Sequence, residues 1–127
     1  MNLEKENEIS NRIIGCAIRV HNVLGPGLIE KVYEECLGHL LVKEGFHVEK
    51  QKLLPIFFED ISLDAGLRLD MLVNDSIIIE LKAVEKVLPV HEAQLYTYLK
   101  LSKKPLGLLM NFNVKLLKDG IKRMVMS

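Results

Sequence analysis

The chain has 127 residues, of which 49% are hydrophobic and 27% are charged, with 8 glycines and 4 prolines. This length and composition predict one globular domain over residues 1–127, and they exclude a disordered tail, a collagen-like repeat and a coiled-coil rod. Seventeen basic and seventeen acidic residues give a formal charge of zero, so no global positive field draws the protein onto nucleic acid or anionic lipid. Tryptophan is absent and aromatic residues make up 6%, which disfavours an extended base-stacking surface.

Two helices are predicted in the first third of the chain. From Glu4 to Leu24 apolar residues recur every three or four positions, as one buried helical face requires. Gly25-Pro26-Gly27 ends this helix, because proline cannot continue it and glycine permits the turn. A second helix is predicted from Leu28 to about Glu44, and it stops at Gly45.

Three strands are predicted in the middle of the chain, where the apolar period changes from that of a helix to that of a strand. The segments are short, rich in branched apolar residues and separated by turn-prone clusters such as Asp64-Ala65-Gly66. They are His47–Phe58, Leu67–Val73 and Ile77–Val84. Their spacing predicts an antiparallel meander.

One helix and one or two strands complete the predicted fold. Pro89 stands where a third helix can begin, and Val90–Ser102 has helical periodicity. The nearly all-apolar run Pro105–Asn113 is typical of a strand covered on both faces, and Leu116–Met126 supplies an edge strand. The fold class is therefore α/β, a mixed sheet flanked by helices.

The cysteines, the first residues and the apolar runs together predict the cellular compartment. Cys16 and Cys36 have no metal-ligand spacing and are too few for a disulfide framework, so we expect small buried side chains in a reducing environment. The first eight residues are polar and acidic, which no signal or transit peptide would be. The longest uncharged apolar runs are far shorter than the ~20 residues that a membrane span needs. We expect a cytoplasmic protein with no membrane partner.

Charged residues stand where burial is predicted in two neighbouring strands. Alternation places Leu69 and Met71 on one face of the second strand and Asp70 on the other. In the next strand it places Glu80 and Lys82 together on one face, between apolar neighbours. An ion pair on a polar face is the usual role of such charges, but the apolar surroundings argue against it, because unpaired buried charge is costly.

The loop between these strands decides whether their carboxylates meet. A three-residue loop, 74–76, places Asp70 directly opposite Glu80, whereas a two-residue loop sends the two side chains to opposite faces. Carboxylates on opposed residues repel, and one pKa rises unless a cation lies between them. Mg²⁺ is the ion that such a pair would bind, since it is coordinated by one or two carboxylates and keeps several water ligands. Lys82 shares the face of Glu80 and could orient a metal-bound water.

Two helices carry further polar residues on their apolar faces. At 100° per residue, Glu30 falls on the apolar face of the second helix, while Glu34 and Glu35 lie outside it. In the third helix His91 and Gln94 share the apolar face. An alternative for Glu30 is an acid favoured by the helix dipole, and for His91 a core histidine with a satisfied hydrogen bond.

These residues form a familiar pattern. Arg68-Leu69-Asp70, ahead of Glu80-Leu81-Lys82 on a following strand, resembles the Asp…Glu-x-Lys signature of the PD-(D/E)XK nuclease superfamily. Gly27-Leu28-Ile29-Glu30-Lys31-Val32-Tyr33 resembles the motif that names the GxxExxY family within it. Segments similar to that family's later motifs are Leu88–Leu95, Gly107–Phe112 and Leu117–Ile121.

The resemblance implies a restriction-endonuclease-like core in which strand-borne acids bind Mg²⁺, with Mn²⁺ as a substitute, for phosphodiester hydrolysis. Carried over residue by residue, it implies three acidic metal ligands, a catalytic lysine and a polar residue on the following helix: Asp70, Glu80 and Glu30, then Lys82, then Gln94. The proline that often precedes the aspartate in the family is replaced by Leu69.

Two functions from different classes stay open. The first is a Mg²⁺-dependent nuclease acting on DNA, which the intact Asp–Glu–Lys set favours. The second is a non-catalytic nucleic-acid-binding or regulatory protein-interaction module that keeps the fold, which the small size and zero net charge favour. For a nuclease we expect weak nucleic-acid binding, because the net charge is zero, and a homodimer, because one small domain offers little surface to a duplex.

Overall fold

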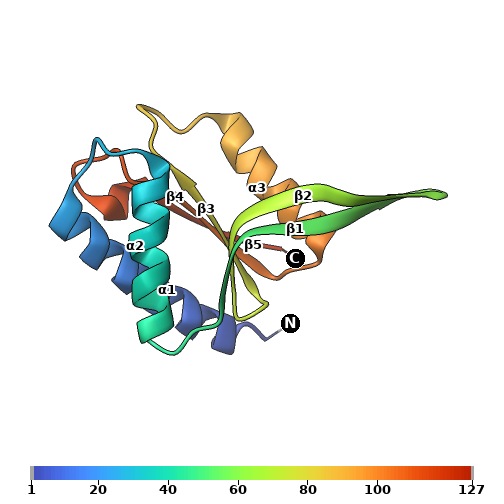
Figure 1. Cartoon of the computed structure of the whole chain (residues 1–127), viewed down its shortest axis with the longest axis horizontal. Helices are drawn as coiled ribbons and strands as arrows, with labels where there is room; N and C mark the ends of the chain where they lie inside the picture. The colour runs from blue at the N-terminus through green and yellow to red at the C-terminus, as the bar shows by residue number, and fades with distance from the viewer. Residues whose placement is uncertain (1, 127) are drawn as a thin grey trace.

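The computed structural model describes residues 2–126. A five-stranded sheet runs through the molecule, with α1 and α2 on one side and α3 on the other (Figure 1). The elements in chain order are α1 (Glu4–Leu24), α2 (Glu30–Lys43), β1 (Val48–Phe58), β2 (Ile61–Val73), β3 (Ile77–Lys82), α3 (Pro89–Ser102), β4 (Leu106–Asn111), the 3₁₀ helix η1 (Leu117–Gly120) and β5 (Ile121–Val125).

The sheet is mixed, as the sequence predicts. Its strand order is β1-β2-β3-β4-β5, and every neighbouring pair is antiparallel except β3 and β4, which are parallel. A parallel pair needs a crossover connection, and α3 supplies it. The three-strand meander, the α/β class and the flanking helices are confirmed.

Two hydrophobic clusters cover the two faces of this sheet. The larger joins α1 and α2 to side chains such as Ile79, Leu81 and Met110, and the smaller joins Leu95 and Leu99 of α3 to the opposite face. Because both faces are covered, β4 is buried along its whole length, in agreement with its apolar sequence. The end of β3 therefore lies between two helical layers.

The β1–β2 hairpin is longer than predicted. The Asp64-Ala65-Gly66 cluster is not a turn, because β2 begins at Ile61 and the chain turns at Glu59 and Asp60. The pairing passes from Leu54 opposite Leu67 to Ile56 opposite Leu63, so the cluster forms an irregularity within the ladder. A Cβ on Gly66 would lie 2.5 Å from the Ile56 side chain, so the glycine permits this close approach. Glycine and aspartate mark bulges as well as turns.

Strict alternation in β2 is also wrong at one point. Leu69 packs in the α3-side cluster, whereas Met71 packs in the cluster beneath α1 and α2. On β1, Gln51 lies between the residues that pair with these two, and its φ is +51°. This left-handed residue coincides with the change of face. Asp70 thus sits where the hairpin changes its orientation.

The predicted burial of the cysteines is confirmed for Cys16 and holds in part for Cys36. Cys16 is buried, Cys36 is half-buried, and both are free thiols. Within residues 2–126, no helix combines the length and the apolar character that crossing a membrane would take.

Candidate active site

The loop between β2 and β3 sets the predicted register. Val73 pairs with Ile77, and Met71 pairs with Ile79, so the loop has three residues. Asn74 and Asp75 both adopt positive φ, which short polar side chains tolerate. Continued by one step, this register puts Asp70 and Glu80 at the same level of the sheet.

The two carboxylates hold the strands together where the backbone ladder ends. The backbone N–H of Asp70 donates to Oε2 of Glu80 at 2.9 Å, and the N–H of Leu81 donates to Oδ2 of Asp70 at 2.8 Å. Each acid therefore accepts a hydrogen bond from the opposite strand. The side chains are fixed by the backbone on which they stand, and Glu80 is only 5% exposed. Such reciprocal bonding makes the pair a rigid feature of the fold.

Burial perturbs the ionisation of both acids. The pKa of Glu80 rises to about 8, first because the group is buried and second because Asp70 carries like charge. Burial also raises the pKa of Asp70, although the Leu81 N–H and the charge of Lys82 oppose the shift. Near neutral pH, Glu80 is thus largely protonated in the metal-free protein. Within residues 2–126, no basic side chain forms an ion pair with either acid.

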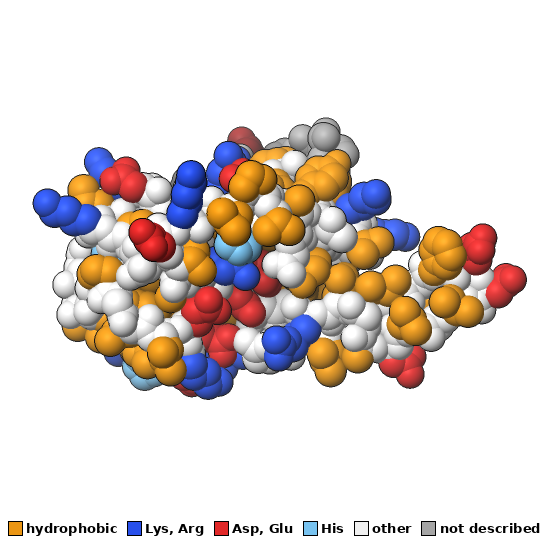
Figure 2. Space-filling view, turned by 90° about the horizontal axis from the view of Figure 1, so that it is seen from above, with side chains coloured by type: hydrophobic (Ala, Val, Ile, Leu, Met, Phe, Trp, Pro, Cys, Tyr) orange, Lys and Arg blue, Asp and Glu red, His pale blue; other side chains and the backbone are white. Residues whose placement is uncertain are grey.

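A polar pocket of about 330 Å³ opens beside Asp70. Its lining combines three carboxylates, two cations, one amide and one apolar side chain: Glu30, Glu34 and Asp70, Lys31 and Arg68, Gln51, and Leu81. Figure 2, which views the molecule from the top of Figure 1, shows acidic side chains gathered near the middle of this face. The pocket brings α2, β1, β2 and β3 to one place.

Glu30 reaches this pocket from the first residue of α2. It is exposed, so its predicted place on a buried helical face is wrong. Its Oε2 accepts a hydrogen bond from the Ala83 N–H at 3.3 Å, just beyond β3. Its charge also helps to raise the pKa of Asp70. Glu30 and Asp70 therefore face the same space although they stand on different elements.

The hydroxyl of Tyr33 fixes the loop before α2. Its hydroxyl donates to the Gly25 carbonyl at 2.6 Å and accepts from the Leu28 N–H at 3.1 Å. The fully buried ring stacks on Phe112, with the ring centroids 4.5 Å apart. Tyr33 is thus a core aromatic residue whose hydroxyl bonds to the backbone. By fixing this loop, Tyr33 positions Glu30.

The chemistry of the donor set fits a divalent cation. Carboxylate oxygens are hard ligands, and Mg²⁺ in proteins is held by one or two carboxylates with water completing its shell. Asp70 and Glu80 supply two such groups, and burial raises the pKa of each, so ionising both of them is unfavourable without a neutralising cation. Over residues 2–126, no three His, Cys, Asp or Glu side chains form a group that could enclose a metal.

Comparison with models of protein families shows to which superfamily the chain belongs. The model of the PD-(D/E)XK nuclease superfamily matches residues 7–124. The chain belongs to this superfamily. Membership and the α/β architecture confirm the predicted restriction-endonuclease-like fold. No curated protein matches the chain, and no solved structure does. Assignment to the GxxExxY family stays a prediction.

In this superfamily member, a buried asparagine that sequence analysis missed, Asn111, fixes the chain just beyond Lys82. Lys82 is half-buried at the end of β3 and pairs with Asn111 in the parallel ladder. Asn111 accepts from the Val84 N–H at 3.1 Å and donates to the Val84 carbonyl at 2.9 Å. It thereby clamps the chain as it leaves β3. The sequence signal that could have revealed this clamp is the single asparagine in the apolar run of β4.

Glu34 is the second residue that sequence analysis misplaced. It is 5% exposed, and its carboxylate accepts from Gln51 Nε2 at 2.6 Å and from Lys31 Nζ at 3.5 Å. The prediction that it projects outside the buried face is wrong, because β1 covers that side of α2. A helical wheel contains no information about a strand seventeen residues further along the chain.

The polar residues of α3 lie nearer the surface than predicted. Gln94 is exposed, so its predicted place on a buried face is wrong, and its Nε2 donates to the Tyr98 hydroxyl at 2.9 Å. Burial raises the pKa of Tyr98, and the charges of Glu80 and Asp70 raise it further, so Tyr98 lies within their electrostatic reach. His91 Nδ1 accepts from the Leu88 N–H at 3.0 Å. It caps the helix and is half-buried.

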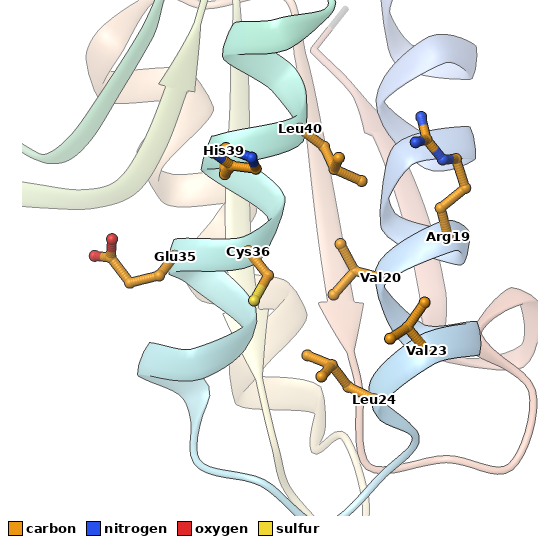
Figure 3. Close-up of a pocket in the computed structure, with 8 residues that line it drawn as sticks. All are labelled: Arg19, Val20, Val23, Leu24, Glu35, Cys36, His39 and Leu40. Carbon is orange, nitrogen blue, oxygen red and sulfur yellow. The ribbon is translucent and has the colours of Figure 1, made fainter.

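A second hollow, of about 360 Å³, lies between α1 and α2 (Figure 3). Side chains such as Val20, Cys36 and Leu40 line it, and Glu35 is its only carboxylate. Glu35 points away from the gap in Figure 3, and its two ion pairs with lysines lower its pKa. This hollow has one carboxylate, whereas three line the pocket beside Asp70, which is therefore the candidate active site.

Proposed function

We propose that this PD-(D/E)XK superfamily member is a Mg²⁺-dependent nuclease that hydrolyses phosphodiester bonds in DNA, with Mn²⁺ able to replace Mg²⁺. The observation that carries the proposal is the Asp70–Glu80 pair, two acids bound to each other's strand at the end of β3. Two adjacent buried carboxylates repel each other when both are ionised, and a cation between them would favour the doubly ionised pair.

Asp70 and Glu80 would hold the ion, and Glu30 would act on it through a water molecule. Bound Mg²⁺ supplies a water of lowered pKa and neutralises charge that develops on the phosphorus oxygens. Glu80 must lose its proton to serve as a ligand, so metal binding and proton release are coupled. Because each acid accepts a backbone hydrogen bond, its free oxygen is already oriented when the ion arrives.

Lys82 would orient the attacking water and add positive charge near the phosphate. It stands two residues beyond Glu80, and its charge opposes the rise in the pKa of both acids, which supports a role for it close to the pair. Arg68 lines the pocket and forms no ion pair within residues 2–126, so its guanidinium is available for phosphate oxygens. Gln94, through Tyr98, would hold a phosphate oxygen or a water.

Zero net charge limits how tightly DNA can bind. Phosphate contacts supply much of the affinity for nucleic acid, and the pocket offers few basic side chains beside its acids. Binding would therefore be weak without the metal and would strengthen when the ion neutralises the carboxylates.

Cleavage assays test the proposal. Single-stranded DNA, duplex DNA and RNA are incubated with the protein in Mg²⁺, in Mn²⁺ and in a chelator. We expect metal-dependent cleavage of DNA that Lys82→Ala and Asp70→Asn each reduce by roughly 100-fold or more. Lys118→Ala, an exposed lysine on η1, is the matched control and should cleave normally.

Two outcomes would overturn it. Undiminished cleavage by a folded Lys82→Ala variant contradicts the role given to the lysine. Binding of DNA or RNA without cleavage in any metal instead supports the non-catalytic module. Circular dichroism of each variant separates lost chemistry from lost folding.

A further inference from the structure

The tip of the β1–β2 hairpin exposes large apolar side chains. Phe57 is 72% exposed and Phe58 is 64% exposed, and Ile61 and Leu63 on the returning strand are also exposed. The hairpin projects from the body of the molecule in Figure 1, and Figure 2 shows apolar side chains along this projection. A cluster of exposed apolar residues rimmed by polar ones is typical of a contact surface.

The charges of the hairpin tip restrict which kind of partner could bind there. Glu59, Asp60 and Asp64 lie among the apolar residues, and residues 53–67 contain no lysine or arginine. None of the three acids forms an ion pair within residues 2–126. A negative tip repels phosphate backbones and anionic lipid headgroups. The surface therefore suits a protein that is both apolar and basic.

The chain itself carries a surface of that kind at the end of α3. Lys100 and Lys103 are exposed, form no ion pair within the described residues, and flank the exposed Leu101. A hollow of about 570 Å³ separates this helix end from the hairpin. The shaft of the hairpin, Leu54 to Phe57, forms its other wall, so the tip of the same hairpin extends beyond it.

Strand addition is a less suitable way to join two copies. β1 is an edge strand, but Pro55 stands within it and has no N–H to donate to a further strand. Contact through side chains avoids this obstacle.

We propose that a second copy of this chain occupies the hollow, with the tip of each hairpin seated beside α3 of the other copy. Glu59 and Asp60 of one copy would face Lys100 and Lys103 of the other, and the phenylalanines would cover Leu101. A two-fold axis makes the two contacts equivalent. The inference concerns a surface distinct from the carboxylate pocket and does not depend on nuclease activity.

A charge exchange tests this pairing. One variant carries Glu59→Lys and Asp60→Lys, and the other carries Lys100→Glu and Lys103→Glu. Light scattering should give a dimer mass for the parent and a dissociation constant weakened roughly tenfold or more for each variant alone. An equimolar mixture should recover the dimer, because both contacts then join opposite charges. A chain with all four substitutions should also dimerise.

Apolar variants provide a second readout. Phe57→Ser with Phe58→Ser should abolish the dimer, whereas Val23→Ser, at a residue 83% exposed on α1, should leave it intact. A parent that is monomeric at its highest soluble concentration overturns the proposal. So does a mixture of folded charge variants that stays monomeric, or a dimer that is indifferent to every tip substitution.

Discussion

The two ends of the β1–β2 hairpin depart from the burial rule in opposite ways. At its base, Asp70 is held against Glu80 in the interior of the fold. At its tip, Phe57 and Phe58 are in solvent. The buried acid destabilises the isolated chain because it loses hydration, whereas the exposed rings contribute little stability because they gain little burial. This contrast agrees with the two proposals, in which the base binds a cation and the tip contacts another protein surface.

The two ends should therefore respond to different conditions. Protonation and metal ions act on the base, because both change the charge of Asp70 and Glu80. Protein concentration acts on the tip, because association is a mass-action effect. A change at one end should leave the response of the other unaltered, since they lie on different parts of the hairpin.

The largest expected effect on stability is at the base. A carboxyl with a pKa raised from 4.5 to about 8 is protonated in the folded chain and ionised in the unfolded chain between those pH values. The unfolded chain then binds fewer protons, so stability falls as pH rises from about 4.5 to about 8 and is level above that range. One pKa unit corresponds to about 1.4 kcal/mol.

Glu80→Gln removes this pH dependence. We expect the variant to be more stable than the parent at pH 9 by about 2–4 kcal/mol, with a flatter profile between the two pKa values. Urea unfolding at pH 5, 7 and 9 measures the difference. Glu85→Gln, an exposed acid on the following loop, is the control and should follow the parent. A parent that gains stability with rising pH over this window would contradict the assignment.

A smaller effect is expected next to the base. Tyr33→Phe leaves the Gly25 carbonyl and the Leu28 N–H without their partner, so the free energy of unfolding should fall by about 1–2 kcal/mol. Thermal denaturation monitored by circular dichroism measures this loss. Tyr96→Phe, whose ring is exposed on α3, should change stability little. Equal losses in the two variants would show that the Tyr33 hydroxyl does not fix the loop.

The smallest change in monomer stability is expected at the tip. Phe57→Ser removes a ring that is mostly in solvent, so the unfolding free energy of the monomer should change by no more than about 0.5 kcal/mol. Unfolding at concentrations below the dimer's dissociation constant isolates this quantity. A large loss would mean that the tip packs against its own chain, and would remove the contrast with the base.

Local sequence patterns predict the body of the fold and fail where distant elements meet. α1 runs from Glu4 to Leu24 as predicted, because its apolar period is unbroken and glycine with proline ends it. The register at the carboxylate pair follows from one loop length. The burial of Glu34 could not be predicted, since it depends on Gln51 of a strand that packs from elsewhere. The turn predicted at Asp64–Gly66 is wrong because turns and bulges favour the same residue types.

The binding of Mn²⁺, measured by calorimetry at pH 7 in buffers of different ionisation enthalpy, tests the central claim most directly. We expect one ion to bind with release of about one proton, and affinity to rise roughly tenfold per pH unit up to about pH 8, because Glu80 must ionise. Asp70→Asn and Glu80→Gln should abolish binding, and Glu35→Gln on the exposed side of α2 should preserve it. Absent binding, or equal binding by the parent and Asp70→Asn, would contradict the claim that this carboxylate pair is a metal site.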